Sequence, residues 1–204
     1  MSFTSFNPLS LPDIRTNDIT LIQRDGLWAG NDYMGGRTVA LSLEVQAVNA
    51  EEFGAAVNLI TQAFSPAIDG EARLSFQIPG LCNGRSAYIN VRTRRRSAPL
   101  DASFARLSCA FEIELFATDP IVYASEESAA TLRNGVPARF SVDGSRPVTP
   151  TITYSSVSDP KVLNALTGES VGATLAPGEH FLELSDPGAG AAASALIKFR
   201  DTWV

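Results

Sequence analysis

Apolar and polar residues alternate over residues 38–48, the first long periodic segment of the chain. A period of two is typical of a strand with one buried face. The same alternation recurs over residues 85–96 and 104–116, with arginines and glutamates at polar positions. Shorter apolar segments predict strands at 19–23 and 72–78. We therefore predict five strands in the first part of the chain.

The period of the pattern changes at Asn49. Apolar residues then recur at helical spacing, at Phe53, Ala56, Val57, Ile60 and Phe64. Asn49 and Glu52 have the spacing of a capping box, and Pro66 ends the pattern. The sequence therefore predicts one helix over residues 50–64, whose single apolar stripe packs against a sheet.

Beyond residue 124 the periodic segments become short, and Pro, Gly, Ser, Thr and Asp recur between them. Strands are predicted at residues 139–142, 151–154, 162–166, 180–184 and 195–199. Their spacing is typical of a small all-β sandwich. We therefore predict a mainly β protein with one helix (α+β), divided into domains at residues 1–124 and 125–204.

The composition argues against most catalytic and metal-binding classes. The chain has 204 residues, with 16 basic and 22 acidic side chains and a formal charge of -6. His180 is the only histidine, and Cys82 and Cys109 lack the short spacing of metal ligands. Lys161 and Lys198 are the only lysines, which leaves few candidates for a phosphate loop or a Schiff base. We expect no enzyme activity, no cofactor and no metal site.

Three further expectations concern the surroundings of the chain. The acidic balance argues against a protein whose whole surface attracts nucleic acid. No segment reaches the roughly 18 apolar residues of a spanning helix, so we expect no membrane insertion. Residues 1–15 lack the basic start and apolar run of a secretory signal, so we expect the chain to stay in the cytoplasm after synthesis.

The most localised charge feature is a run of basic residues on one predicted strand: Arg92, Arg94, Arg95 and Arg96. Strand alternation places Arg92, Arg94 and Arg96 on one face. The run can be a solvated strand end, or an electrostatic contact with acidic partners or passing nucleic acid. It can also pair with glutamates of the next strand or contact another subunit, and we favour the subunit contact.

The glycine-rich segment 25–36 is a second interface candidate. It lacks the spacing of a phosphate-binding loop and the pattern of an EF-hand. Trp28 and Tyr33 are large rings on a predicted loop, where contact residues are more common than catalytic ones. With Arg37 at the end of the segment, they are predicted interface residues. A catalytic His180 would need a nucleophile or an orienting acid brought to it by the fold, and we treat that role as a minor alternative.

Several short motifs resemble the distal tail protein family of long-tailed, non-contractile phages. They are Arg24-Asp25-Gly26, Gly30-Asn31-Asp32, Gly36-Arg37-Thr38 before the first long strand, Pro79-Gly80, and Ala117-Thr118-Asp119-Pro120 followed by Tyr123. The helix at 50–64 stands where that family has one. Beyond residue 125, the segments 147–150, 164–168, 175–178 and the final Asp201-Thr202-Trp203 are similar to the family's C-terminal β-sandwich.

The resemblance implies a homohexameric ring at the lower end of the tail tube, in the virion's tail tip or baseplate. The first domain would be a tube-protein-like β-sandwich or split barrel that forms the ring. The second would be a small galectin-like sandwich that points outward. Partners would be further copies of the chain, the tail tube protein, the tail-tip hub protein, the tape-measure protein and genomic DNA in transit.

Three alternatives remain. One is a carbohydrate-binding module for host recognition that uses Tyr154 or Trp203 of the second domain. Another is a hydrolase of cell-wall material that uses His180 or paired acids, and the third is a tail tube protein. The segment between Gly168 and Leu175 is shorter than the usual excursion of the family, and the second domain has few aromatic residues.

Overall fold

Strands β6 (Arg37–Gln46) and β9 (Ser108–Ala117) are the central pair of a sheet in the first of two structural units. The computed structural model describes residues 2–190 and 192–204. Burial alternates along both strands, with Val39 and Val45 inside and Ala40 and Glu44 outside. The alternation predicted for this part of the sequence is therefore confirmed.

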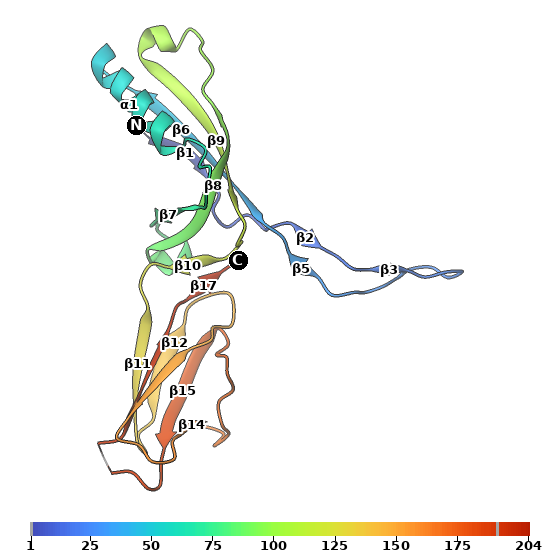
Figure 1. The fold of residues 1–204 in the computed structure, drawn as a ribbon, viewed down its shortest axis with the longest axis vertical. Coiled ribbons are helices and arrows are strands. Elements are labelled where there is room, and N and C mark those ends of the chain that lie inside the picture. The colour runs from blue at the N-terminus through green and yellow to red at the C-terminus, as the bar shows by residue number, and fades with distance from the viewer. Residues whose placement is uncertain (1, 191) are drawn as a thin grey trace. The chain divides into compact units, whose positions relative to one another are not determined.

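Strand β1 (Ser2–Phe6) pairs with the free edge of β6, and β8 (Ala87–Ser97) pairs with the free edge of β9. The resulting order is β1-β6-β9-β8, with antiparallel pairing throughout (Figure 1). Strand β7 (Ala72–Phe76) pairs with β8 outside this path. Strand β1 was not predicted, because its five residues show no clean alternation of apolar and polar side chains.

Helix α1 (Ala50–Ala63) confirms the predicted helix within one residue at its end. The Asn49 side chain accepts a hydrogen bond of 2.9 Å from the backbone N–H of Glu52, which satisfies one of the free donors of the first turn. Phe53 and Ile60 are buried on the sheet side. The ring of Phe53 meets Phe104 edge-on, with centroids 5.1 Å apart.

The segment between β1 and β6 folds back on itself as a narrow two-stranded ribbon, which we call the arm (residues 11–34) (Figure 1). Strand β2 (Ile14–Arg15) pairs with β5 (Tyr33–Met34), and β3 (Ile19–Thr20) pairs with β4 (Leu27–Trp28). The strand predicted at 19–23 is thus only two residues long. The predicted loop at 25–36 is the returning half of the arm.

The predicted start of the strand at residues 104–116 is wrong. Residues 104–106 form a 3₁₀ turn, η2 (Phe104–Arg106), and β9 begins only at Ser108. Leu107 has a left-handed backbone conformation with φ of 57°, which lies outside the β region of a regular strand. The apolar pattern of Phe104 and Leu107 therefore reflects packing next to the strand, not strand alternation.

The second unit is a sandwich of two three-stranded antiparallel sheets, β11-β16-β13 and β12-β15-β14. The bounds are β11 (Ser128–Arg133), β12 (Ala138–Val142), β13 (Thr151–Ser155), β14 (Lys161–Asn164), β15 (Gly178–Ser185) and β16 (Ser194–Phe199). Leu132, Leu184 and Ile197 belong to the buried apolar cluster between the sheets. Each strand predicted in this part is found, and β11 is an addition.

Three shorter elements complete the second unit. They are η1 (Cys82–Gly84), β10 (Val122–Ala124) and β17 (Thr202–Trp203). Strand β10 pairs with β17 and with Ala87 and Tyr88 at the start of β8. The second unit contains residues 75–88 and the described part of 121–203, and the first contains 2–74, 89–120 and 204. The segment 75–88 was placed in the first domain by the sequence prediction of 1–124 and 125–204.

The predicted fold class, mainly β with one α-helix, is confirmed, and the strands of the first unit form an open sheet. Among the residues that the structure describes, no helix combines the length and the apolar character that a membrane span requires.

Candidate functional site

The arm presents most of the exposed large apolar side chains of the first unit. These are Leu11, Ile14, Ile19, Ile22, Leu27, Trp28 and Tyr33. Trp28 is 69% exposed and Ile22 is 88% exposed, although such side chains are normally covered. Exposed apolar side chains that gather on one segment make it a candidate for contact with another molecule. Trp28 and Tyr33, predicted from sequence as contact residues, are therefore placed where a partner can reach them.

Close backbone contacts hold the two halves of the arm together. The N–H of Gly30 donates to Oδ1 of Asp18 over 2.9 Å, and the N–H of Gly35 donates to the carbonyl of Asp13 over 2.6 Å. A Cβ at Gly30 would lie 2.0 Å from the carbonyl oxygen of Asn17. The motif Gly30-Asn31-Asp32 thus begins with a glycine because no side chain fits between the two halves.

Gly36 stands where the arm joins the sheet. A Cβ there would lie 2.2 Å from Cζ of Phe116, so the ring of Phe116 occupies the space of a side chain. The guanidinium of Arg94 lies 4.8 Å from the centre of the same ring, and that of Arg92 lies 5.9 Å from it. Two arginines of the predicted cluster therefore make cation–π contacts within their own chain.

Arg37, the third predicted contact residue of this segment, is fully buried. Its Nη1 donates to the carbonyl oxygen of Pro8 over 2.7 Å. Within the described residues, its Nε and Nη2 have no hydrogen-bond partner. Burial lowers the pKa of the Arg37 guanidinium, because desolvation disfavours the charged form. Within one chain, the Arg37 side chain therefore links the start of β6 to Pro8, close to where the arm begins, and it has no exposed surface.

The arginine cluster is divided between the two faces of β8. A bulge between Thr93 and Arg95 shifts the register, so that Arg95 stands opposite Glu114 and Arg96 opposite the buried Ile113. The prediction that Arg92, Arg94 and Arg96 share one face is therefore wrong. A regular period of two cannot continue through a bulge, and the sequence carries no clear signal for one here.

Arg96 reaches the end of helix α1. Its Nη1 donates to the carbonyl oxygens of Thr61, over 2.5 Å, and of Phe64, over 3.1 Å. The last turn of α1 contains no basic residue of its own. A cation at this position satisfies unpaired carbonyls and interacts favourably with the negative end of the helix dipole. Arg96 thus has a structural role inside the unit.

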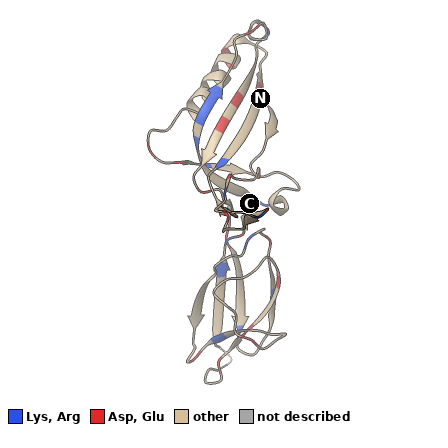
Figure 2. Ribbon diagram, turned by 90° about the vertical axis from the view of Figure 1, so that its right-hand side faces the viewer, with Lys and Arg blue, Asp and Glu red and all other residues tan. Residues whose placement is uncertain are grey.

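The exposed face of β6 and β9 carries short and acidic side chains. Ala40 stands opposite Glu114, Ser42 opposite Glu112, and Glu44 opposite Ala110. The Ser42 hydroxyl donates to Glu112 over 2.7 Å. Figure 2 shows the acidic positions in the middle of this sheet and the arginines on a neighbouring strand. Within the described chain, the arginines of β8 form no ion pair with Glu112 or Glu114.

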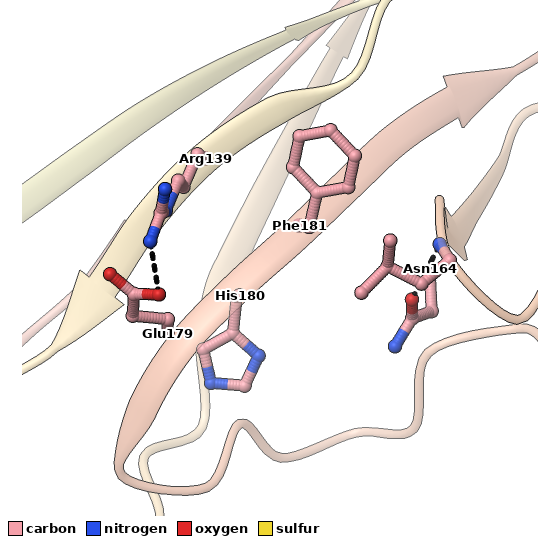
Figure 3. A pocket seen from close by; sticks show the side chains of 6 residues that line it. Arg139, Asn164, Glu179, His180 and Phe181 are labelled. Carbon is pink, nitrogen blue, oxygen red and sulfur yellow. Dashed lines mark hydrogen bonds and ion pairs between the residues drawn. The ribbon is translucent and has the colours of Figure 1, made fainter.

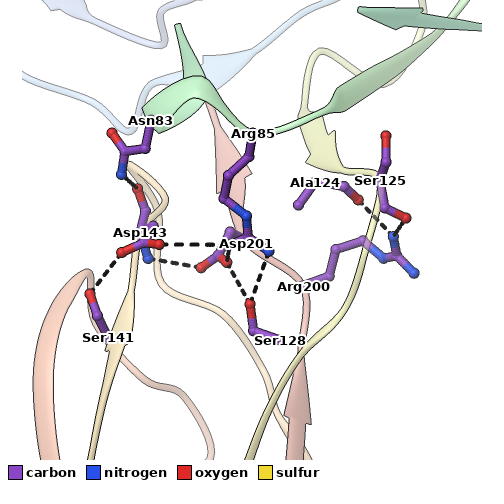
Figure 4. A network of polar contacts seen from close by, with 9 residues as sticks. All are labelled: Asn83, Arg85, Ala124, Ser125, Ser128, Ser141, Asp143, Arg200 and Asp201. Atoms are coloured by element: carbon purple, nitrogen blue, oxygen red, sulfur yellow. Dashed lines mark hydrogen bonds and ion pairs between the residues drawn. The ribbon is translucent and has the colours of Figure 1, made fainter. Parts of the chain in front are cut away.

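In the second unit, a polar network surrounds the buried Asp201 (Figure 4). Arg85 donates to its Oδ2 in an ion pair, and the Ser128 hydroxyl donates to the same oxygen over 3.0 Å. The backbone N–H of Asp143 donates to Oδ1 over 2.9 Å. A buried carboxylate needs such partners, because burial of an unpaired charge is costly. These contacts link Asp201, the residue before β17, to Arg85, Ser128 and Asp143 of the same unit.

A cavity of about 420 Å³ opens on the sandwich, and Figure 3 shows its lining. The lining residues are Arg139, Asn164, Leu166, Glu179, His180 and Phe181. Arg139 on β12 forms an ion pair with Glu179 on β15, and Phe181 stands opposite Arg139 across the two strands. This cavity was not predicted, because its residues come from three strands and from the turn after β14, which only the fold brings together.

The aromatic residues named for carbohydrate binding do not line this cavity. Trp203 is only 6% exposed, so it cannot serve as a platform for a sugar ring. Tyr154 is exposed on the edge strand β13. The ring of His180 stacks on Phe140, and its Nε2 lies 2.7 Å from the carbonyl oxygen of Ala176. Its hydrogen-bond partner is thus a backbone carbonyl, whereas a catalytic histidine would need a nucleophile or an acid.

The two cysteines are buried free thiols. Burial raises the pKa of Cys82 to about 11 and also raises that of Cys109. A thiol with a raised pKa is a poor nucleophile at neutral pH. Among the described residues, no group of three or more His, Cys, Asp or Glu side chains is arranged to hold a metal ion.

Neither the family models nor the curated proteins that were compared match this chain. Among solved structures, the fold is similar to the crystal structure of the Dit protein (gp 19.1) of SPP1, described as a paradigm of the hub adsorption apparatus in Gram-positive infecting phages. The TM-score is 0.65 at 12% sequence identity. The match covers 100% of this chain and 93% of the SPP1 protein, so both units of the chain share their fold with SPP1 Dit.

Proposed function

We propose that this chain is a structural component of a phage tail tip, a distal tail adaptor that assembles into a ring. The observation that carries the proposal is the fold likeness to SPP1 Dit, which extends over both units. Short motifs of the sequence independently resemble the distal tail protein family. The role is assembly and passage, without chemistry, and the ring joins the tail tube above to the tail-tip hub below.

The arm supports the self-assembly part of the proposal. Its exposed apolar side chains include Trp28 and Tyr33, residue types that often dominate the energy of interfaces. An arm that covers a different surface of the next copy gives a heterologous contact, and such contacts close into a ring when the rotation allows it. The resemblance to the family implies six copies in the ring.

The acidic face of β6 and β9 supports the passage part of the proposal. Glu44, Glu112 and Glu114 are exposed there among alanine and serine side chains. A surface of this charge repels phosphates, so DNA in transit would not bind to it. In the proposed ring this face lines the channel, and Arg95 lies on the strand beside it.

Native mass spectrometry of the purified full-length chain tests the self-assembly. A ring-forming chain is expected to give one discrete oligomer of six copies whose share rises with protein concentration. A strictly monomeric chain at every concentration would contradict the ring. A series of ever longer stacked oligomers would favour the tail tube protein instead.

A further inference from the structure

One edge strand of the second unit is neither paired nor protected on its outer side. Strand β13 pairs with β16, and among the described residues no strand pairs with its other side. Backbone N–H and C=O groups of alternate residues therefore point out of the sheet edge without a ladder partner. The sequence of β13, TITYS, contains no charged residue and no proline, which are residue types that protect exposed edges. Such an edge is a template for pairing with another chain.

The other edge strands of the sandwich are covered or charged. Residues 169–171 run beside β14, where the N–H of Val171 donates to the carbonyl oxygen of Val162 over 2.9 Å. Strands β11 and β12 each contain an arginine, Arg133 and Arg139. The unprotected edge is therefore particular to β13.

The inner side chains of β13 are incompletely covered. Ile152 stands opposite the buried Ile197, and Tyr154 stands opposite the buried Ala195, so both point into the sandwich. Ile152 packs against the buried apolar cluster, but Tyr154 is 39% exposed. The inward ring stays exposed because no described strand lies beyond β13 to cover it.

A cleft of about 240 Å³, which we call the edge cleft, is lined by these two side chains. Its lining also includes Val162, Leu175 and Leu182, which belong to the buried apolar cluster of the sandwich. The volume is several times the roughly 30 Å³ that one water molecule occupies in the liquid. The edge cleft therefore has room for apolar side chains of a partner.

The free edge and the edge cleft together specify the chemistry of that partner. Another polypeptide in an extended conformation offers donors and acceptors at the spacing of a β ladder. Alternate side chains of an added strand would point towards the edge cleft and the others towards solvent. A side chain in the cleft meets residues of the buried cluster, where an unpaired charge is costly. The partner segment is therefore extended, apolar at the positions that face the cleft and polar between them.

Two segments of this chain fit that description poorly. In a second copy, Ile152 of β13 already packs against the cluster of its own sandwich, so it is not available for the edge cleft of a neighbour. The strands of the arm are already paired with each other. A segment of a different protein is thus the better match to both the edge and the cleft.

We propose that the free edge of β13 binds an extended segment of another protein by strand addition. The segment extends the sheet β11-β16-β13 by one strand, and its apolar side chains fill the edge cleft and cover Tyr154. All the residues involved belong to the second unit, so the inference goes beyond ring formation and does not depend on it.

Hydrogen–deuterium exchange of the full chain, followed by mass spectrometry, tests strand addition, because a new ladder protects free backbone N–H groups of β13. The probes are short synthetic peptides in which threonine alternates with valine, isoleucine, leucine or phenylalanine, with a lysine at each end for solubility. Control peptides carry proline or aspartate at the central apolar position. We expect at least one alternating peptide to slow exchange in β13 saturably, and the control peptides to leave it unchanged. Exchange in β11, the opposite edge of the same sheet, should not change.

Two glycines then locate the binding. Gly172 lines the edge cleft, and a Cβ there would meet no atom within 4 Å, so Gly172→Leu occupies part of the cleft without a clash. This variant should weaken peptide binding about tenfold. Gly190 is equally open but lies outside the lining of the cleft, so Gly190→Leu is the matched control and should bind like the unchanged chain.

Thermal unfolding separates a loss of binding from a loss of fold. Both glycine variants should unfold at the temperature of the unchanged chain. If Gly172→Leu unfolds at a lower temperature, Tyr154→Asp serves as the second variant, because it places a charge at the partly exposed inner position of β13. It should also weaken peptide binding.

Four outcomes would overturn the proposal. One is a panel in which no alternating peptide slows exchange in β13. Another is equal protection by the proline or aspartate peptides, and a third is equal weakening of binding by Gly172→Leu and Gly190→Leu. The fourth is protection of β13 that rises with protein concentration without any peptide, which would mean that β13 pairs between copies of this chain. The oligomeric state is measured separately by native mass spectrometry, so failure here would leave the proposed ring untouched.

Discussion

Among the described residues, seven large apolar side chains of the arm are exposed, whereas eleven apolar side chains of the second unit form a buried cluster. The arm is held by two-residue strand pairs, which are too short to be stable alone. The sandwich has two sheets that cover each other. The stability of the second unit thus lies within the chain, whereas the apolar side chains of the arm would be covered only in the proposed ring. Mutation can therefore separate assembly from folding.

The largest expected effect is on assembly. The double substitution Ile22→Asp and Trp28→Ala places a charge and a gap in the exposed apolar surface of the arm. Each contact between copies should weaken by about 4 kcal/mol, roughly a thousandfold. Native mass spectrometry should show monomers, and the melting temperature of the monomer should not change.

Ile68 supplies the matched control for the arm. It is 100% exposed in the first unit but lies outside the arm. The Ile68→Ser variant should assemble like the unchanged chain. If it disrupts the oligomer as strongly as the arm variant does, the contact is not specific to the arm.

The next effect is on folding of the second unit. Leu184 is fully buried between the sheets, and Leu184→Ala should lower the free energy of unfolding by about 3 kcal/mol through lost burial and a cavity. Urea denaturation measures the change. Leu166→Ala, at an exposed position of the same unit, should change it by less than about 0.5 kcal/mol. Equal losses for the two variants would mean that the sandwich core is placed wrongly.

A smaller effect tests the part of the first unit outside the arm. Arg96→Met keeps most of the side-chain length but removes both hydrogen bonds to the end of α1. The free energy of unfolding should fall by about 2 kcal/mol, the usual contribution of hydrogen bonds from a charged group. Arg95→Met, at the neighbouring exposed position, should have little effect on urea denaturation. A larger loss for Arg95→Met would contradict the bulge.

The smallest effect is a pH dependence in the second unit. Burial raises the pKa of Cys82 from 9.0 to about 11, so the unfolded chain loses the thiol proton at a lower pH than the folded chain does. The stabilising contribution of the neutral thiol is complete below pH 9 and is lost as the pH rises towards 11. Stability should fall by about 1 kcal/mol between pH 8 and pH 10 from this group. Urea denaturation at pH 8 and at pH 10 measures the change. In Cys82→Ala, the difference in the free energy of unfolding between these two pH values should be smaller by that amount.

The sequence predicted the parts of the fold that follow a regular period. The alternation around Val39 and the spacing from Phe53 to Phe64 gave the central strand and the helix within two residues. The bulge beside Arg95 could not be predicted, because a bulge inserts a residue without a compositional signature. Burial of Arg37 was also hidden, since an arginine that follows a glycine-rich segment is normally exposed.

The arm and the cavity of the second unit also differ in how far the sequence predicts them. The exposure of Trp28 and Tyr33 could be predicted, because these large rings stand in a glycine-rich segment outside any regular apolar pattern. The cavity in the sandwich could not be, because Arg139, Asn164 and Glu179 are polar residues of separate short strands. Their proximity depends on the register of β12 and β14 on β15, which the sequence does not state.

Cryo-electron microscopy of purified phage tails that contain this chain tests the central claim most directly. We expect a single ring of this chain at the tail tip, between tube and hub, with each arm on the neighbouring copy. Glu44, Glu112 and Glu114 should face the channel. Tails that lack the chain, a chain repeated along the whole tube, or arms that contact no other copy would contradict the account.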